Sequence, residues 1–225
     1  MPLALMLFGK PICSDMMKKN LLTLAAILLF IPARGQFRFG FQGGVNLTTL
    51  IERNYQHDYA ENFYKVGFNA GPFAEFKVGK HLSLVTALIL ETKGTQGTVR
   101  LDTIAADLST SLLYLDVPLL IRGNLKTGNF TCFMEAGPYA GFGLSGKATA
   151  KSGGKTISRD IRWGSGIDDD FTRLDLGGMA GAGVEWKHFF LEGTFMLGLA
   201  NIYPVGEIDY NIHHRVFSLR VGYFL

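Results

Sequence analysis

Apolar and polar residues alternate along most of this chain after Gln36. In the first such stretch, residues 37–49, one phase is apolar and the other mostly polar: Phe37, Phe39, Phe41, Val45 and Leu47 against Arg38, Gln42, Asn46 and Thr48. Successive side chains of a β-strand point to opposite faces of the sheet. A period of two therefore predicts a strand with one apolar and one polar face.

The same alternation recurs, and it predicts eight strands: 37–49, 65–78, 82–93, 112–125, 130–145, 173–186, 189–200 and 215–225. The segments between them alternate in length. Short turns fall at 79–80, 126–129 and 187–188, and long connections at 51–64, 94–111, 146–172 and 201–214. The Lys187-His188 pair lacks the Asn-Gly signature of a tight hairpin, which leaves a longer turn open there. An even number of strands joined in this way is typical of outer-membrane barrels. The expected fold class is all-β, an eight-stranded antiparallel up-and-down transmembrane β-barrel.

Charge in the polar phase favours a membrane barrel over a soluble, lipocalin-like carrier with an apolar interior. The polar phase carries seven basic residues, seven acidic residues and many glycines, whereas the apolar phase holds a charged residue only at Arg215. A closed lumen needs such a balance, because an unpaired buried charge is costly. Glycine suits a narrow interior better than a wall that faces water. We expect structural lumen charges at Arg38, Glu75, Glu91, Lys93, Asp116, Arg122, Glu135, Arg173, Asp175, Glu185, Glu192 and Arg220.

The predicted turn at 126–129 allows one pair of facing side chains to be predicted by residue. If that turn sets the register of its two strands, Arg122 lies near Glu135.

The N-terminus reads as an export signal. Lys18 and Lys19 precede an apolar run over residues 21–31, and the small residues Ala33 and Gly35 stand just before Gln36. The run is too short to cross about 30 Å of hydrocarbon. We expect residues 1–35 to be a signal peptide, with residues 1–15 as an over-long N-terminus, and residues 36–225 to form the barrel domain in the outer membrane.

Composition argues against several kinds of chemistry. Of the two cysteines, Cys13 leaves with the predicted leader and Cys132 is then alone, so no intrachain disulfide is expected. No Cys/His cluster suggests a metal, and Asp168-Asp169-Asp170 lacks the ligand spacing of a calcium loop. A net charge of +3 with no basic patch gives no reason to expect nucleic-acid binding. We predict no cofactor.

Four segments resemble a known family. They are Tyr114-Leu-Asp-Val-Pro-Leu-Leu-Ile-Arg122, Glu135-Ala-Gly-Pro-Tyr-Ala-Gly141, Gly181-Ala-Gly-Val-Glu-Trp186 and the closing Arg215-Val-Phe-Ser-Leu-Arg-Val-Gly-Tyr223. Together they resemble the PorT-like outer-membrane β-barrel family of Bacteroidota. The resemblance implies an eight-stranded barrel and supplies no catalytic residues. One branch of that family is tied to the type IX secretion system.

The expected function is non-enzymatic: envelope structure or assembly, or binding through the extracellular loops. The expected partners are outer-membrane lipids or lipopolysaccharide, the outer-membrane insertion machinery, and secretion-system or other envelope proteins. The longest loop, 146–172, mixes basic and acidic residues that could hold such a partner.

The alternatives are a lipid-modifying enzyme, a pore and the soluble carrier. His57, His213 and His214 lie on the outer side, but no serine motif accompanies them, so we expect exposed loop histidines. A pore is disfavoured because bulky side chains at Phe73, Phe133, Tyr139, Met179 and Met196 fall in the lumen phase of a narrow barrel.

Overall fold

The computed structural model describes residues 37–53, 63–101, 104–166, 168–204 and 211–225. The chain divides into two units, Met1–Gly35 and Gln36–Leu225, and every described residue belongs to the second. The predicted signal peptide and His57 fall outside the described residues. Within them, no helix is both long and apolar enough to cross a membrane.

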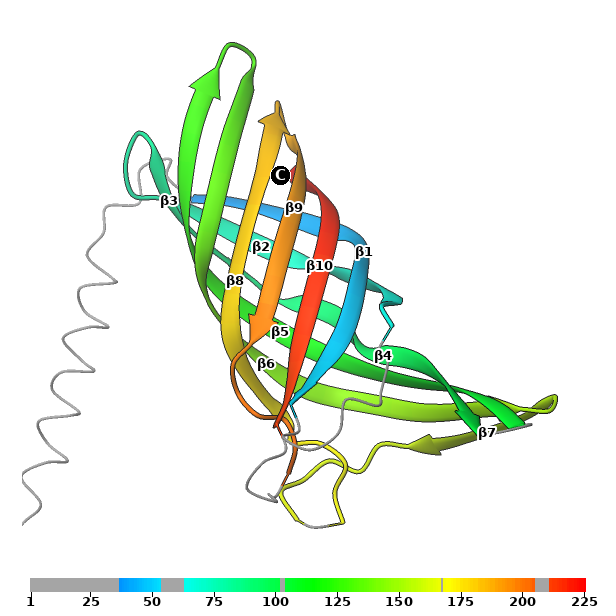
Figure 1. The fold of residues 1–225 in the computed structure, drawn as a ribbon. Coiled ribbons are helices and arrows are strands. Elements are labelled where there is room, and N and C mark those ends of the chain that lie inside the picture. The colour runs from blue at the N-terminus through cyan, green and yellow to red at the C-terminus, as the bar shows by residue number, and fades with distance from the viewer. Residues whose placement is uncertain (1–36, 54–62, 102–103, 167, 205–210) are drawn as a thin grey trace, which may run out of the picture. The chain divides into compact units, whose positions relative to one another are not determined.

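The second unit is built from antiparallel strands (Figure 1). Their bounds are β1 Phe37–Arg53, β2 Lys65–Lys77, β3 Leu82–Ala87, β4 Ile89–Leu101, β5 Ile104–Thr127, β6 Phe130–Ser152, β7 Lys155–Asp160, β8 Leu174–Trp186, β9 Phe189–Gly198 and β10 Asn211–Phe224. β10 pairs with β1 from Gly40↔Phe224 to Arg53↔Asn211, which closes the sheet on itself. β3 and β4 act as one strand and β7 pairs only with β6, so the ring has eight strands. The predicted fold class is confirmed.

The break between β3 and β4 has a local cause. Leu88 lies opposite Pro72 of β2, and its neighbour Ala87 lies opposite Pro118 of β5; neither proline carries an N–H to donate to the ladder. The Leu88 N–H still donates to the Pro72 carbonyl at 3.0 Å. The register with β5 is the same before and after the break, from Leu82↔Gly123 to Ile89↔Asp116. β3 and β4 therefore form one continuous strand position of the barrel.

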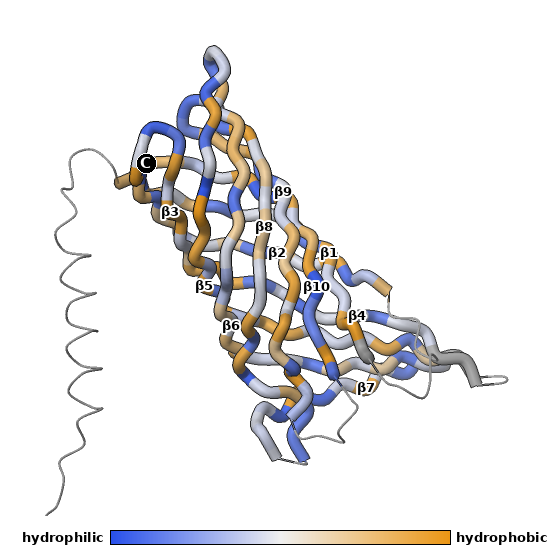
Figure 2. Tube along the Cα trace, turned by 60° about the vertical axis from the view of Figure 1, so that its left-hand side comes forward, coloured by the Kyte–Doolittle hydropathy of each residue, from blue (hydrophilic) through white to orange (hydrophobic). Residues whose placement is uncertain are grey.

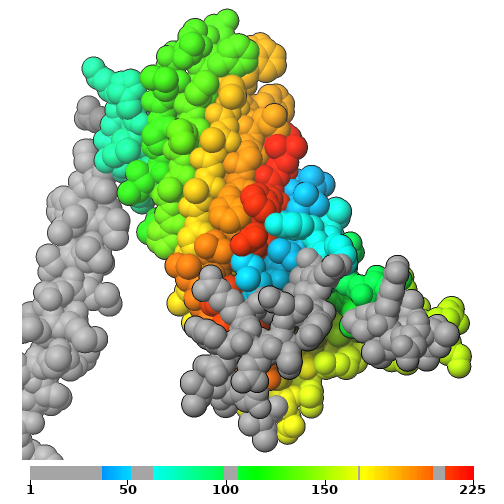
Figure 3. Space-filling model, in the orientation of Figure 1, coloured from blue at the N-terminus to red at the C-terminus, as the bar shows by residue number. Residues whose placement is uncertain are grey.

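The two phases of the strands have opposite exposure. Outward side chains are apolar and exposed, for example Val66 at 69% and Met134 at 72%, whereas Glu75, Lys93 and Asp116 are fully buried. Hydropathy alternates along each strand in Figure 2, and β6, β8, β9 and β10 form a continuous wall in Figure 3. The end of the barrel with short connections, here called the turn end, carries exposed outward aromatic side chains at Phe37, Phe130, Trp186, Phe189 and Tyr223. This is the arrangement of an aromatic girdle.

The turn between β8 and β9 has only two residues. Trp186 pairs with Phe189, and Lys187 adopts the left-handed conformation with a φ of 57°. A tight turn thus forms here without the Asn-Gly signature, and the longer turn left open by the sequence does not occur.

The opposite end, here called the loop end, departs most from the expected boundaries. The pairing of β4 with β5 continues to Leu101↔Ile104, and β6 runs on to Ser152 before β7 turns back along it. Residues 94–101, 104–111, 146–152 and 155–160 form a sheet, here called the flap, which projects past the other strands (Figure 1). The expectation that 94–111 and 146–172 are loops was wrong for these residues. Their outward side chains are polar, so the apolar alternation that identified the other strands stops before the strands do.

Candidate functional site

The turn-end half of the lumen holds ion pairs against a cluster of phenylalanines. Arg38 binds Glu75 and Glu185, with 2.6 Å from Nη1 to the nearer Glu185 oxygen. Arg122 lies opposite Glu135 in the β5–β6 register, as expected, and its Nε donates to Glu135 Oε2 at 2.7 Å. The turn itself is shorter than the predicted 126–129, because Thr127 already pairs with Phe130. Its guanidinium also lies 4.0 Å from the ring centroid of Phe133.

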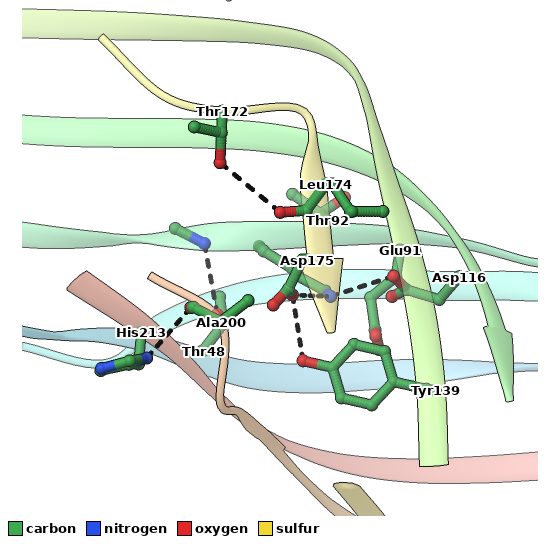
Figure 4. A network of polar contacts seen from close by, with 12 residues as sticks. Thr48, Glu91, Thr92, Asp116, Tyr139, Thr172, Leu174, Asp175, Ala200 and His213 are labelled. Atoms are coloured by element: carbon green, nitrogen blue, oxygen red, sulfur yellow. Dashed lines mark hydrogen bonds and ion pairs between the residues drawn. The ribbon is translucent and has the colours of Figure 1, made fainter. Parts of the chain in front are cut away.

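A second network surrounds Lys93 towards the loop end (Figure 4). Lys93 Nζ contacts Asp116 Oδ1 at 3.0 Å and Asp175 Oδ2 at 2.9 Å, and all three side chains are fully buried. The Tyr139 hydroxyl donates to the same Asp175 oxygen at 3.0 Å. The ring of Tyr114 lies 4.7 Å from Nζ. Four strands thus converge on one ammonium group.

Glu91 and Arg220 lie in the same interior. Glu91 accepts from Asn46 Nδ2 at 3.3 Å, and Arg220 Nη2 lies 3.6 Å from its carboxylate. Glu192 is buried opposite Arg220 in the β9–β10 register.

Arg173 does not lie in the lumen. It is exposed at the rim, donates to the Gly143 carbonyl at 2.7 Å, and stacks near Trp163 and Phe142. It stands just before β8, where the chain has not yet entered the ring.

The expected balance of lumen charge was wrong. Among the described residues, the fully buried charged side chains are six acids and three bases: Glu75, Glu91, Asp116, Glu135, Asp175 and Glu192 against Lys93, Arg122 and Arg220. Lys77 and Arg173 are exposed, and Lys65 is half-buried at the start of β2 with its ammonium bonded to Ser109 and Ser111.

Residues 161–166 and 168–172, here called the cap, pack against the loop end of the lumen. Ile161 packs against Leu112 and Tyr114, and the Trp163 ring lies 5.7 Å from that of Tyr114. Trp163 and Phe171 form a backbone bridge. Trp163 fits because position 143 lacks a side chain: a Cβ there would overlap the indole ring. The apolar residues of 146–172 were the signal that could have predicted the cap.

The outer histidines are not a catalytic pair. His214 is fully buried with its ring 5.1 Å from Tyr114, so it is not the exposed loop residue expected, because β10 begins at Asn211 rather than at Arg215. His213 Nδ1 lies 3.0 Å from the Ala200 carbonyl oxygen. In the described part of the chain, no group of three His, Cys, Asp or Glu side chains is placed to hold a metal.

The flap carries a pocket of about 530 Å³. Its lining combines hydroxyl, amide, carboxylate and ammonium groups with one aromatic ring: Phe63, Gln96, Gly97, Thr98, Asp107, Leu108, Ser109, Thr149 and Lys151. Thr98 Oγ1 donates to Asp107 Oδ1 at 2.8 Å, and Phe63 is 49% exposed. Sequence reasoning missed this pocket, because its residues come from connections taken as loops.

Comparison with known proteins identifies similar barrels. The family model described as outer membrane protein beta-barrel domain matches residues 31–203. No curated protein matches the chain. Among solved structures, Ail of Yersinia pestis is 13% identical, with 84% of this chain and 99% of that chain covered and a TM-score of 0.39. OprG from Pseudomonas aeruginosa is 11% identical, with 84% and 96% covered and a TM-score of 0.47. Neisserial surface protein A is 10% identical, with 82% and 96% covered and a TM-score of 0.40.

Proposed function

Because the chain belongs to the outer membrane protein beta-barrel domain family and is located in the outer membrane, we propose that it is a non-enzymatic barrel that binds a ligand through its flap. We infer the PorT-like relationship from residues 114–122, 135–141, 181–186 and 215–223. We infer a partnership with the insertion machinery from the alternating C-terminal strand.

The observation that carries the proposal is a change in the outward face of β5 and β6. This face is apolar up to Leu113 of β5 and Leu144 of β6. Beyond them it becomes polar, with Ser111, Ser109 and Asp107 on β5 and Lys147, Thr149 and Lys151 on β6. Charged side chains on a lipid-facing surface are costly, so the flap extends beyond the hydrocarbon. Short turns face the periplasm in such barrels, which puts the flap outside the cell.

The chemistry of the flap pocket favours a sugar. Hydroxyl, amide and carboxylate groups can donate to and accept from sugar hydroxyls, and the exposed Phe63 ring offers an apolar surface for a pyranose. The sugars nearest to a flap at the outer leaflet are those of lipopolysaccharide. We therefore propose that the flap binds the saccharide portion of lipopolysaccharide.

The filled lumen and the histidines do not support the other candidates. Phe73, Phe133, Tyr139, Met179 and Met196 are all buried in the lumen, which leaves little room for diffusion. His214 is buried and the His213 ring bonds to a backbone carbonyl, so neither supports chemistry on a lipid in the outer leaflet.

Titration of the refolded barrel with lipopolysaccharide core oligosaccharide tests the proposal. Phe63→Ala and Asp107→Ala should each weaken binding about tenfold, since each removes a contact of roughly 1–2 kcal/mol. Ile157→Ala is the matched control, because Ile157 lies on the opposite face of the flap and is 73% exposed. Calorimetry that detects no binding, or equal binding by all variants, would contradict the proposal.

A further inference from the structure

The turn end of the lumen opens into a small cavity of about 250 Å³, here called the turn-end cavity. We propose that it binds a phosphate-like oxyanion from the periplasmic side. This site is at the opposite end of the barrel from the flap and does not depend on the function proposed for the flap.

The first argument is an excess of positive charge. Lys77, Lys80 and Lys126 line the cavity, and no carboxylate of the described residues lies within 4.0 Å of their ammonium groups. The only acid in the lining is Glu185, and both of its oxygens accept from Arg38, at 2.6 and 3.0 Å. Three unpaired ammonium groups around one cavity repel one another, and a bound anion would relieve that repulsion.

The second argument is the direction of these side chains. Lys77 stands in the same phase of β2 as the buried Glu75, and Lys126 in the same phase of β5 as the buried Arg122. The outward residues next to them are Phe76 and Leu125. Lysines that served only to reach lipid headgroups around the barrel would stand in the outward phase. These lysines instead line the mouth of the lumen.

The third argument is the set of neutral donors. Asn124 Nδ2 donates to Ser83 Oγ at 2.9 Å, so the Ser83 hydroxyl retains its own proton for a ligand. The Thr131 hydroxyl also lines the cavity. Hydroxyl and ammonium donors around a space of this size suit a tetrahedral oxyanion, because charge-assisted hydrogen bonds to phosphate oxygens are short and strong. The ligand is either free phosphate or the phosphate of a lipid headgroup.

The experiment uses the full chain with Lys77→Met and Lys126→Met combined. Both side chains are exposed, so the barrel should still fold, which heat-dependent electrophoretic mobility would verify. Lys155→Met is the matched control, because Lys155 is an exposed lysine of β7 on the flap. Inorganic phosphate is titrated by ³¹P NMR in a nonionic detergent, and phosphatidylglycerol is titrated into nanodiscs of zwitterionic lipid.

Saturable phosphate binding that weakens at least tenfold in the double variant, and not in Lys155→Met, is the expected result and identifies a free anion as a sufficient ligand. The same loss seen only with phosphatidylglycerol also supports the site and identifies a headgroup as the source. Absence of binding in both systems would overturn the proposal, as would binding that the double variant retains in full.

Discussion

Glycine in the lumen phase is paired with aromatic rings on the neighbouring strand. Gly222 pairs with Phe190, Gly183 with Phe133 and Gly40 with Phe73, in each case directly across the ladder. A Cβ at any of these glycines would overlap the ring of its partner. The glycines therefore make room for rings that lie flat against the barrel wall, a use of strand glycine that also pins the register.

Replacement of one of these glycines should be destabilising. We expect Gly222→Ala to lower the free energy of unfolding by about 1–3 kcal/mol, the usual cost of overpacking a filled interior. Gly193→Ala is the control, because Gly193 faces outward and a Cβ there would meet no atom within 4 Å. Its effect should be below about 1 kcal/mol. Denaturant titration in detergent measures the free energy of unfolding of both variants. Equal losses of stability would contradict the view that Gly222 makes room for the Phe190 ring.

At the scale of elements, one ion pair ties the cap to β7. Asp170 accepts from Nη1 and Nη2 of Arg159, at 2.7 and 2.9 Å, and from the Arg162 backbone N–H at 2.9 Å. The hydrogen bond from Arg159 lowers the pKa of Asp170 below its usual range. A carboxyl whose pKa is lowered by folding stabilises the folded form above its ordinary pKa, and this contribution is lost as the pH falls through the lowered value.

Acidification should therefore loosen the cap. The chain has two tryptophans, so Trp186→Phe leaves Trp163 as the only reporter. We expect the fluorescence of Trp163 to shift to the red only when the pH falls well below the ordinary aspartate pKa of about 4, because Asp170 keeps its charge down to its lowered pKa. In the Asp170→Asn variant, the fluorescence of Trp163 should already be shifted to the red at neutral pH. It should show no further change on acidification.

Asp168→Asn, an exposed change in the same loop, serves as the control for the cap. It should behave like the parent protein. An acid transition that persists in Asp170→Asn would assign the effect to another group.

At the scale of the whole molecule, side chains of the described residues occupy the axis of the eight-stranded ring. Buried apolar side chains fill the lumen in two clusters below the cap, one around Phe73, Phe190 and Phe224 and one around Met179 and Met196. Eight strands enclose only enough space for side chains. We therefore expect the barrel to conduct no ions.

Planar-bilayer recordings of the purified protein should show no steady porin-sized steps. Trp163→Gly should remain silent as well, because loss of the Trp163 ring from the cap leaves the two apolar clusters in place. Porin-sized steps from the parent protein would show that the lumen is open. Steps from Trp163→Gly alone would show that the cap is the only barrier.

The sequence alone determined the barrel, because lipid imposes an apolar outward face on every strand and each strand displays that constraint locally. It also determined the pairing of Arg122 with Glu135, since a short turn sets the register of the strands it joins. It did not determine the flap, whose outward side chains lie beyond the lipid and so lose the apolar signal.

Only the tertiary structure decided which charges of the polar phase are buried. Lys93 and Lys77 stand in the same kind of alternation, yet Lys93 is fully buried between Asp116 and Asp175 while Lys77 is exposed at the turn end. The height of a residue along the barrel axis depends on the tilt and stagger of the closed ring. That height places Lys77 at the turn-end cavity and Arg173 at the rim.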